Sequence, residues 1–139
     1  MSERGHAAVE LALAVAALLL PVAIVLLAFG PWSERRVTAE AIAAEAARSA
    51  AIELDLDAGM ESIVAQIRGL GFEDPVKVGW CGAEPSSPAQ GVCPFTRGSV
   101  VSVTVSLWAP VVTTPWGDVG GVWVVGEHSE PIDLYRSMG

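Results

Sequence analysis

The stretch that decides the fold is GHAAVELALAVAALLLPVAIVLLAFG, residues 5–30. Between Ala7 and Phe29 the only charged side chain is that of Glu10. A helix rises about 1.5 Å per residue, so this segment is roughly 35 Å long as a helix, and the hydrocarbon core of a bilayer is about 30 Å thick. The sequence therefore predicts a membrane-spanning helix over residues 6–31.

A secretory signal peptide that is removed is the alternative interpretation of this segment. The apolar run is longer than the core of about 7–15 residues that such peptides have, and Ala28-Phe29-Gly30 is a poor cleavage site for signal peptidase. A retained span is therefore favoured. Pro21 predicts a kink within it, and Gly30-Pro31 predicts a joint at its outer end.

The basic residues on the two sides of the span are nearly balanced, with Arg4 before it and Arg35 and Arg36 after it. A long C-terminal domain crosses a membrane largely regardless of its charge, and the two cysteines favour an oxidising compartment. We therefore expect a single-pass protein of the cell membrane, with a cytoplasmic N-terminus and an extracytoplasmic C-terminal domain.

Cys81 and Cys93 are the only cysteines, and the segment between them is rich in Gly, Pro and Ser. Two ligands without partnering histidines cannot build a zinc site. A Cys81–Cys93 disulfide is the favoured prediction, and two unpaired thiols are the alternative. Closing a loop of this size contributes about 3 kcal/mol to the free energy of unfolding.

Residues 32–139 predict one small α+β domain that begins with two helices. Ser33 is the expected N-cap of a helix that ends near Leu54, and Asp55 or Asp57 is the expected N-cap of the next, which ends at Gly69 or Gly71. The first helix has a face of small residues that suits close packing: Val37, Ala41, Ala44, Ala47 and Ala51. The second has an apolar stripe expected in the core: Met60, Ile63, Val64, Ile67 and Leu70.

After these helices the apolar pattern changes to the two-residue period of strands. Strands are predicted at 76–80, at 101–107 and at 122–125. Pro110, Pro115 and Gly117 predict a connection between the last two, and residues 117–121 predict a hairpin turn. The expected arrangement is an antiparallel sheet of three or four strands.

Composition and motifs argue against several classes of function. The net charge of −8 and the scattered arginines argue against nucleic-acid binding. His128 is expected on the surface, and the acidic residues 53, 55, 57 and 61 lack the pattern of a calcium loop. We therefore predict no catalytic site, cofactor, metal or small-molecule substrate.

Four tryptophans serve either the core or a contact surface, and two or more are expected in the core: Trp80, Trp108, Trp116 and Trp123.

The N-terminal sequence RGHAAVELAL, residues 4–13, resembles that of TadE-like and TadG-like proteins of the tight-adherence (Flp) pilus system, a type IV pilin-like family. Pro21 and the sequence EPIDLYR, residues 130–136, resemble the family more loosely. The resemblance implies that prepilin peptidase removes a leader of residues 1–5, cutting between Gly5 and His6. Glu10 is then the fifth residue of the mature chain, where pilins carry a glutamate.

The resemblance also implies that Glu10 pairs with the new amino terminus of an adjacent subunit. A buried charge that loses its partner costs roughly 3–5 kcal/mol, so such a pair can set the register of assembly. The alternative is that Glu10 lies shallow enough in the membrane to reach the headgroups.

The function expected from the resemblance is that of a minor pilin or pseudopilin, a structural component of a tight-adherence (type IVb) pilus. Its partners would be the membrane, prepilin peptidase and other pilin subunits, with a place in a surface filament or in its assembly. The alternative is a stably anchored, unprocessed extracytoplasmic domain that binds a ligand or a cell-wall component through tryptophans. No constellation of residues supports an enzyme.

Overall fold

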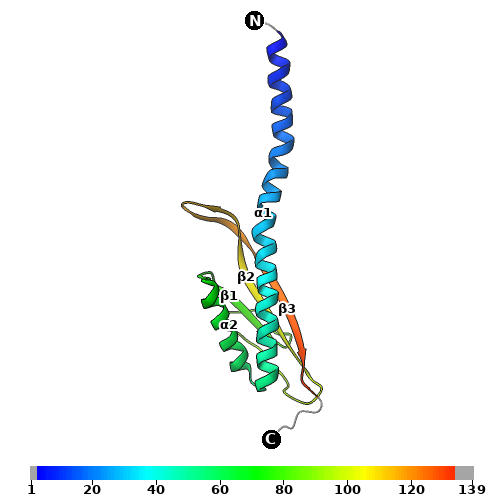
Figure 1. Ribbon diagram of the computed structural model, residues 1–139, viewed down its shortest axis with the longest axis vertical. Helices are drawn as coiled ribbons and strands as arrows, with labels where there is room; N and C mark the ends of the chain where they lie inside the picture. Colours follow the sequence, from blue (N-terminus) through cyan, green and yellow to red (C-terminus); the bar gives the residue numbers. More distant parts are fainter. Residues whose placement is uncertain (1–2, 134–139) are drawn as a thin grey trace.

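The computed structural model describes residues 3–133, and the side chains of residues 7–26, 29–111 and 115–133. The fold is α+β, as the sequence predicts. Two helices precede three strands: α1 (Glu3–Glu53), α2 (Leu56–Leu70), β1 (Val76–Trp80), β2 (Val100–Thr114) and β3 (Gly117–Pro131). In Figure 1 the N-terminal half of α1 projects free of the rest of the molecule, and its C-terminal half lies beside α2 and the sheet.

Helix α1 is continuous, so the joint predicted at Gly30-Pro31 and the new N-cap at Ser33 are wrong. Pro21 and Pro31 both lie inside it. A proline removes one backbone hydrogen bond, which a long helix can lose without ending. The Ser33 hydroxyl donates to the Gly30 carbonyl oxygen over 2.9 Å, so it supports the turn beside Pro31 instead of beginning a helix.

The link between the helices follows from local backbone chemistry. Leu54 adopts a left-handed conformation with φ 58°, and the Asp55 N–H donates back to the Ala50 carbonyl over 3.2 Å, which closes the last turn of α1. The Asp55 carboxylate accepts from the Asp57 N–H over 3.1 Å and caps α2. Helix α2 ends at left-handed Gly71, so one of the two predicted caps is confirmed at each end.

The sheet is antiparallel in the order β1-β2-β3. Val78 pairs with Val105, and Leu107 pairs with Val124. The predicted alternation over residues 101–107 is confirmed except at one position: the valines and Leu107 are buried, and of the polar residues between them only Ser106 is buried as well. They face α1, with which β2 makes extensive contact.

The hairpin of β2 and β3 is longer than predicted. Pro110 lies inside β2 instead of in a connection, and residues 117–121 belong to β3, because the turn is at residues 115–116. Strand β1 begins at Val76, opposite Leu107, and runs away from Pro110, so β2 has no β1 neighbour at Pro110. A proline without an N–H is tolerated at such an open edge.

The core lies between the C-terminal half of α1, the sheet and α2. Its α1 members are mainly alanines: Ala39, Ile42, Ala43, Ala46, Ala47, Ala50 and Ala51. The predicted small face is therefore wrong in part, since Ala47 and Ala51 are buried whereas Val37 is 67% exposed. Alanines occur on every side of this helix, so the sequence pattern has too little contrast to define which side is buried.

Close approach of the backbones explains why these core residues are small. A Cβ added to Gly126 of β3 would lie 2.3 Å from the backbone of Ala39. A Cβ added to Gly59 of α2 would lie 2.4 Å from the Trp80 ring and 3.0 Å from the Ala46 carbonyl oxygen. Both approaches are too close for a side chain, so glycine is required at both crossings.

The expected core stripe of α2 is correct only in part. Ile63 is buried, and Met60 and Ile67 pack partly buried against the core. Val64 and Leu70 are exposed, because α2 packs at the side of the domain and buries only a narrow face.

The predicted disulfide between Cys81 and Cys93 is present, with a Cα–Cα distance of 5.3 Å. The loop that it closes folds back on the free edge of β1. The Val78 N–H donates to the Ser86 carbonyl over 3.0 Å, and the Trp80 N–H donates to the Gln90 carbonyl over 2.9 Å. The loop thereby covers an edge that would otherwise be open to pairing with another chain.

Candidate functional site

The apolar half of α1, residues 7–29, is the most unusual surface of the molecule. It belongs to a helix long and apolar enough to cross a membrane, and none of its most apolar window is buried inside the chain. Leu18, for example, is 70% exposed. A monomeric soluble domain rarely leaves so large an apolar surface to water. This surface therefore needs lipid or another apolar helix around it.

The residues singled out in the sequence all lie at the start of this half. Gly5 and His6 belong to the first turns of α1, where the structure describes the backbone alone. The Glu10 side chain is exposed on the helix surface, and no ion pair to it is found within the described part of the chain. Cleavage after Gly5 and pairing of Glu10 with a neighbouring subunit stay predictions.

Aromatic and basic side chains follow the apolar half. The rings of Phe29 and Trp32 are 5.6 Å apart, and the Arg36 guanidinium lies 5.8 Å from the Trp32 ring centroid. Arg36 also donates from Nε to a Glu40 carboxylate oxygen over 3.1 Å. An apolar segment of a helix that is followed by tryptophan and then by arginines is typical of the level where a membrane meets water.

A hollow lined only by apolar residues lies at this level, between α1 and the β2–β3 hairpin. Helix α1 contributes Val25, Phe29 and Trp32, and the two strands contribute Ala109, Pro110, Val111 and Val122. Sequence reasoning missed this hollow because it placed Pro110 in a connection and ended the hairpin too early. The only signal in the sequence was the presence of valines on both sides of the turn.

Arg35 fastens the loop after α2 to α1 near the same level. Its Nη2 lies 3.3 Å from an Asp74 carboxylate oxygen, and its guanidinium lies 4.1 Å above the Phe72 ring. The pair is partly buried, so solvent screens it less than a fully exposed pair. This contact fixes the position of the segment that leads from α2 into β1.

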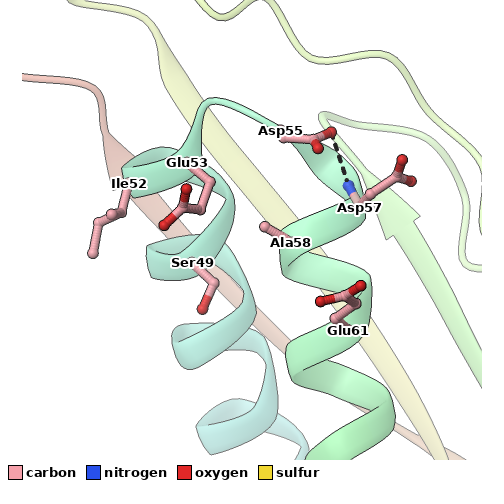
Figure 2. A pocket seen from close by; sticks show the side chains of 7 residues that line it. All are labelled: Ser49, Ile52, Glu53, Asp55, Asp57, Ala58 and Glu61. Atoms are coloured by element: carbon pink, nitrogen blue, oxygen red, sulfur yellow. Dashed lines mark hydrogen bonds between the residues drawn. The ribbon is translucent and has the colours of Figure 1, made fainter.

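The acidic residues lie around an open hollow at the other end of the domain, where α1 ends and α2 begins (Figure 2). The side chains of Glu53 and Asp57 point in opposite directions, and the Asp55 carboxylate is used by the helix cap. Over residues 3–133 no group of three or more His, Cys, Asp or Glu side chains is placed to hold a metal ion. Capping and solvation account for these carboxylates.

The four tryptophans beyond α1 lie in three kinds of surroundings. Trp80 alone is in the core, so the expectation of two or more is wrong. Trp108 and Trp123 are partly buried and pack edge to face, 5.4 Å apart, with Lys77 Nζ 4.1 Å from the Trp123 ring. Trp116, at the hairpin turn, is 93% exposed. His128 is partly exposed on β3, 3.5 Å from Glu130.

The fold and its surfaces define a class, namely an α+β protein with one apolar helix that is long enough to cross a membrane. No protein-family model, curated protein or solved structure matches the chain.

Proposed function

We propose that the chain is a minor pilin or pseudopilin-like structural component of a tight-adherence (Flp, type IVb) pilus system. In this proposal the apolar half of α1 anchors it in the cell membrane, with the N-terminus cytoplasmic and the domain extracytoplasmic. The observation that carries the proposal is that α1 is one continuous helix, whose apolar half is exposed and whose other half is embedded in the domain. The resemblance of residues 4–13 to the TadE-like and TadG-like proteins is the reason for proposing this particular pilus system.

The side chains of the apolar half suit both the lipid and the neighbouring helices that a pilin-like subunit contacts. Its exposed leucines and valines are apolar enough for the lipid interior. The alanines between them are small enough for the helices of neighbouring subunits to approach closely. The same surface can therefore pass from lipid into an assembly without a change of fold.

Glu10 is the residue to which the proposal gives a specific role. It is the only charge in the apolar half, and it is exposed on the helix surface, where a neighbour can reach it. After cleavage between Gly5 and His6, the amino terminus of an adjacent subunit would supply the matching positive charge. In apolar surroundings an unpaired carboxylate is costly. Assembly would therefore favour the register in which each Glu10 meets the amino terminus of an adjacent subunit.

Processing tests the proposal most directly. The chain is produced in cells with and without a prepilin peptidase, extracted from the membrane, and its intact mass is measured. We expect loss of Met1–Gly5 only with the peptidase, and no loss in Gly5→Leu, whose side chain blocks the cut. A retained leader in the native sequence would contradict processing and favour the stably anchored binding domain.

Glu10→Gln tests the pairing role in the same cells. We expect this variant to be processed and inserted but absent from sheared filaments or pilus complexes, whereas the native chain is found there. Glu34→Gln is the matched control, because Glu34 is an exposed carboxylate on the same helix beyond the apolar half. Normal assembly of Glu10→Gln would exclude the pairing role.

A further inference from the structure

We propose that the far part of the β2–β3 hairpin, residues 109–122, lies on the surface of the bilayer that α1 crosses, with Trp116 at the level of the lipid headgroups. We call this segment the hairpin arm. The partner is a lipid surface. The inference rests on the membrane span of the proposed function, and it is independent of leader cleavage and of filament assembly.

The position of the arm is the first argument. Val25, Phe29 and Trp32, from the last turns of the apolar half onward, line the same hollow as Pro110 and Val111 of the arm. Figure 1 shows the arm bending away from the helix axis at the level where the apolar half ends. A bilayer that surrounds residues 7–29 therefore reaches the arm.

The side chains of the arm are the second argument. Trp116 is 93% exposed at the turn, and Val111, Val119 and Val122 are also exposed. The described part of the chain leaves much of these apolar side chains uncovered, whereas valines of the same strands are buried in the domain. Tryptophan is enriched where membranes meet water, because its ring is apolar and its N–H is polar.

The backbone sets the depth of the arm. Beyond Leu107 the described part of β2 pairs with β3 alone, so the arm is a two-stranded ribbon with two open edges. Unpaired N–H and C=O groups are costly in hydrocarbon, where no water can satisfy them. The exposed carboxylate of Asp118, beside the turn, also needs water. The arm therefore lies among the headgroups and does not enter the hydrocarbon core.

A second copy of the chain is the other occupant that could cover these side chains. The membrane is favoured because the hollow is continuous with the apolar half of α1, which lies in lipid in the proposed function. Contact with the bilayer would also hold the domain at a second point. Its orientation relative to the membrane plane would then be fixed in addition to its height.

The test places an environment-sensitive fluorophore on single introduced cysteines in the full chain, with the native disulfide kept oxidised, in phosphatidylcholine vesicles. Trp116→Cys and Val119→Cys report on the arm, and the second variant keeps the tryptophan. Arg97→Cys, in an exposed turn before β2, is the water control. Ala16→Cys, in the middle of the apolar half, shows whether α1 spans. Spin-labelled lipids and iodide serve as quenchers.

We expect headgroup-level spin labels to quench positions 116 and 119 and spin labels deep in the acyl chains to quench position 16. Iodide should quench position 97 much more than position 116. Quenching of positions 116 and 119 by iodide alone, with position 16 quenched by deep labels, would overturn the proposal for the arm and leave the span intact. Protection from iodide that disappears as the lipid-to-protein ratio rises would overturn it in favour of a second copy. Loss of deep quenching at position 16 would instead refute the span itself.

Discussion

The two halves of α1 differ in the size of their side chains and in what surrounds them. The apolar half exposes large leucines and valines, whereas the embedded half, residues 39–51, buries mainly alanines. A soluble helix would do the opposite, because burying a large apolar side chain gains more free energy than burying an alanine. The small side chains of the embedded half allow α1 to pack closely against the sheet and α2. The large side chains of the apolar half suit apolar surroundings that the described part of the chain does not provide.

The strongest test of this difference removes volume from the embedded half. Ile42 is 1% exposed, and Ile42→Ala leaves a cavity that we expect to lower the free energy of unfolding by about 2–5 kcal/mol. Val37→Ala is the control on the same helix, with an expected change within about 0.5 kcal/mol because Val37 is mostly exposed. Denaturant unfolding in detergent measures both. Equal effects would show that the two positions are not packed as described.

The next test adds volume where the embedded half meets the sheet. Gly126→Ala puts a methyl group against the backbone of Ala39, and we expect a loss of about 1–3 kcal/mol. Gly69→Ala, in α2, brings the added carbon within 4 Å of nothing beyond the neighbouring backbone of its own helix, and it should gain about 0.5–1 kcal/mol from helix propensity. Opposite shifts in the unfolding midpoint are expected. A neutral Gly126→Ala would mean that helix and sheet are farther apart.

The smallest effect is expected in the apolar half. Leu18 touches none of the domain core, so Leu18→Ala should change the unfolding of the domain by less than about 0.5 kcal/mol. Leu107→Ala, the same substitution at a buried position, should cost about 2–5 kcal/mol. Both are compared in the same detergent. A large loss for Leu18→Ala would show that the first half packs on the domain and would remove the contrast between the halves.

The sequence predicts the parts of this fold that have strong local signals. The apolar half, the cap at Asp55, the end of α2 at Gly71 and the Cys81–Cys93 disulfide are all present. Each depends on composition or on a few neighbouring residues, and tertiary packing alters none of them.

The incorrect predictions depend on context that a single sequence does not show. Pro31 is typical of a helix end, but α1 continues through it because the turns on both sides stay helical. Pro110 is typical of a loop, but β1 begins only opposite Leu107, so Pro110 lies at an open edge of β2 that tolerates it. The hairpin arm and its hollow follow from this second error. The roles of Gly5, His6 and Glu10 stay predictions, because they depend on an enzyme and on neighbouring subunits.

The absence of a joint at Gly30-Pro31 links the two halves of α1 in angle as well as in distance. An α-helix has about 3.6 residues per turn, so each residue between the halves turns one relative to the other by about 100°. The side of the helix on which Glu10 lies therefore determines the direction in which the domain and its hairpin point. In an assembly held together by α1, this angle would give every copy of the domain the same heading around the assembly axis.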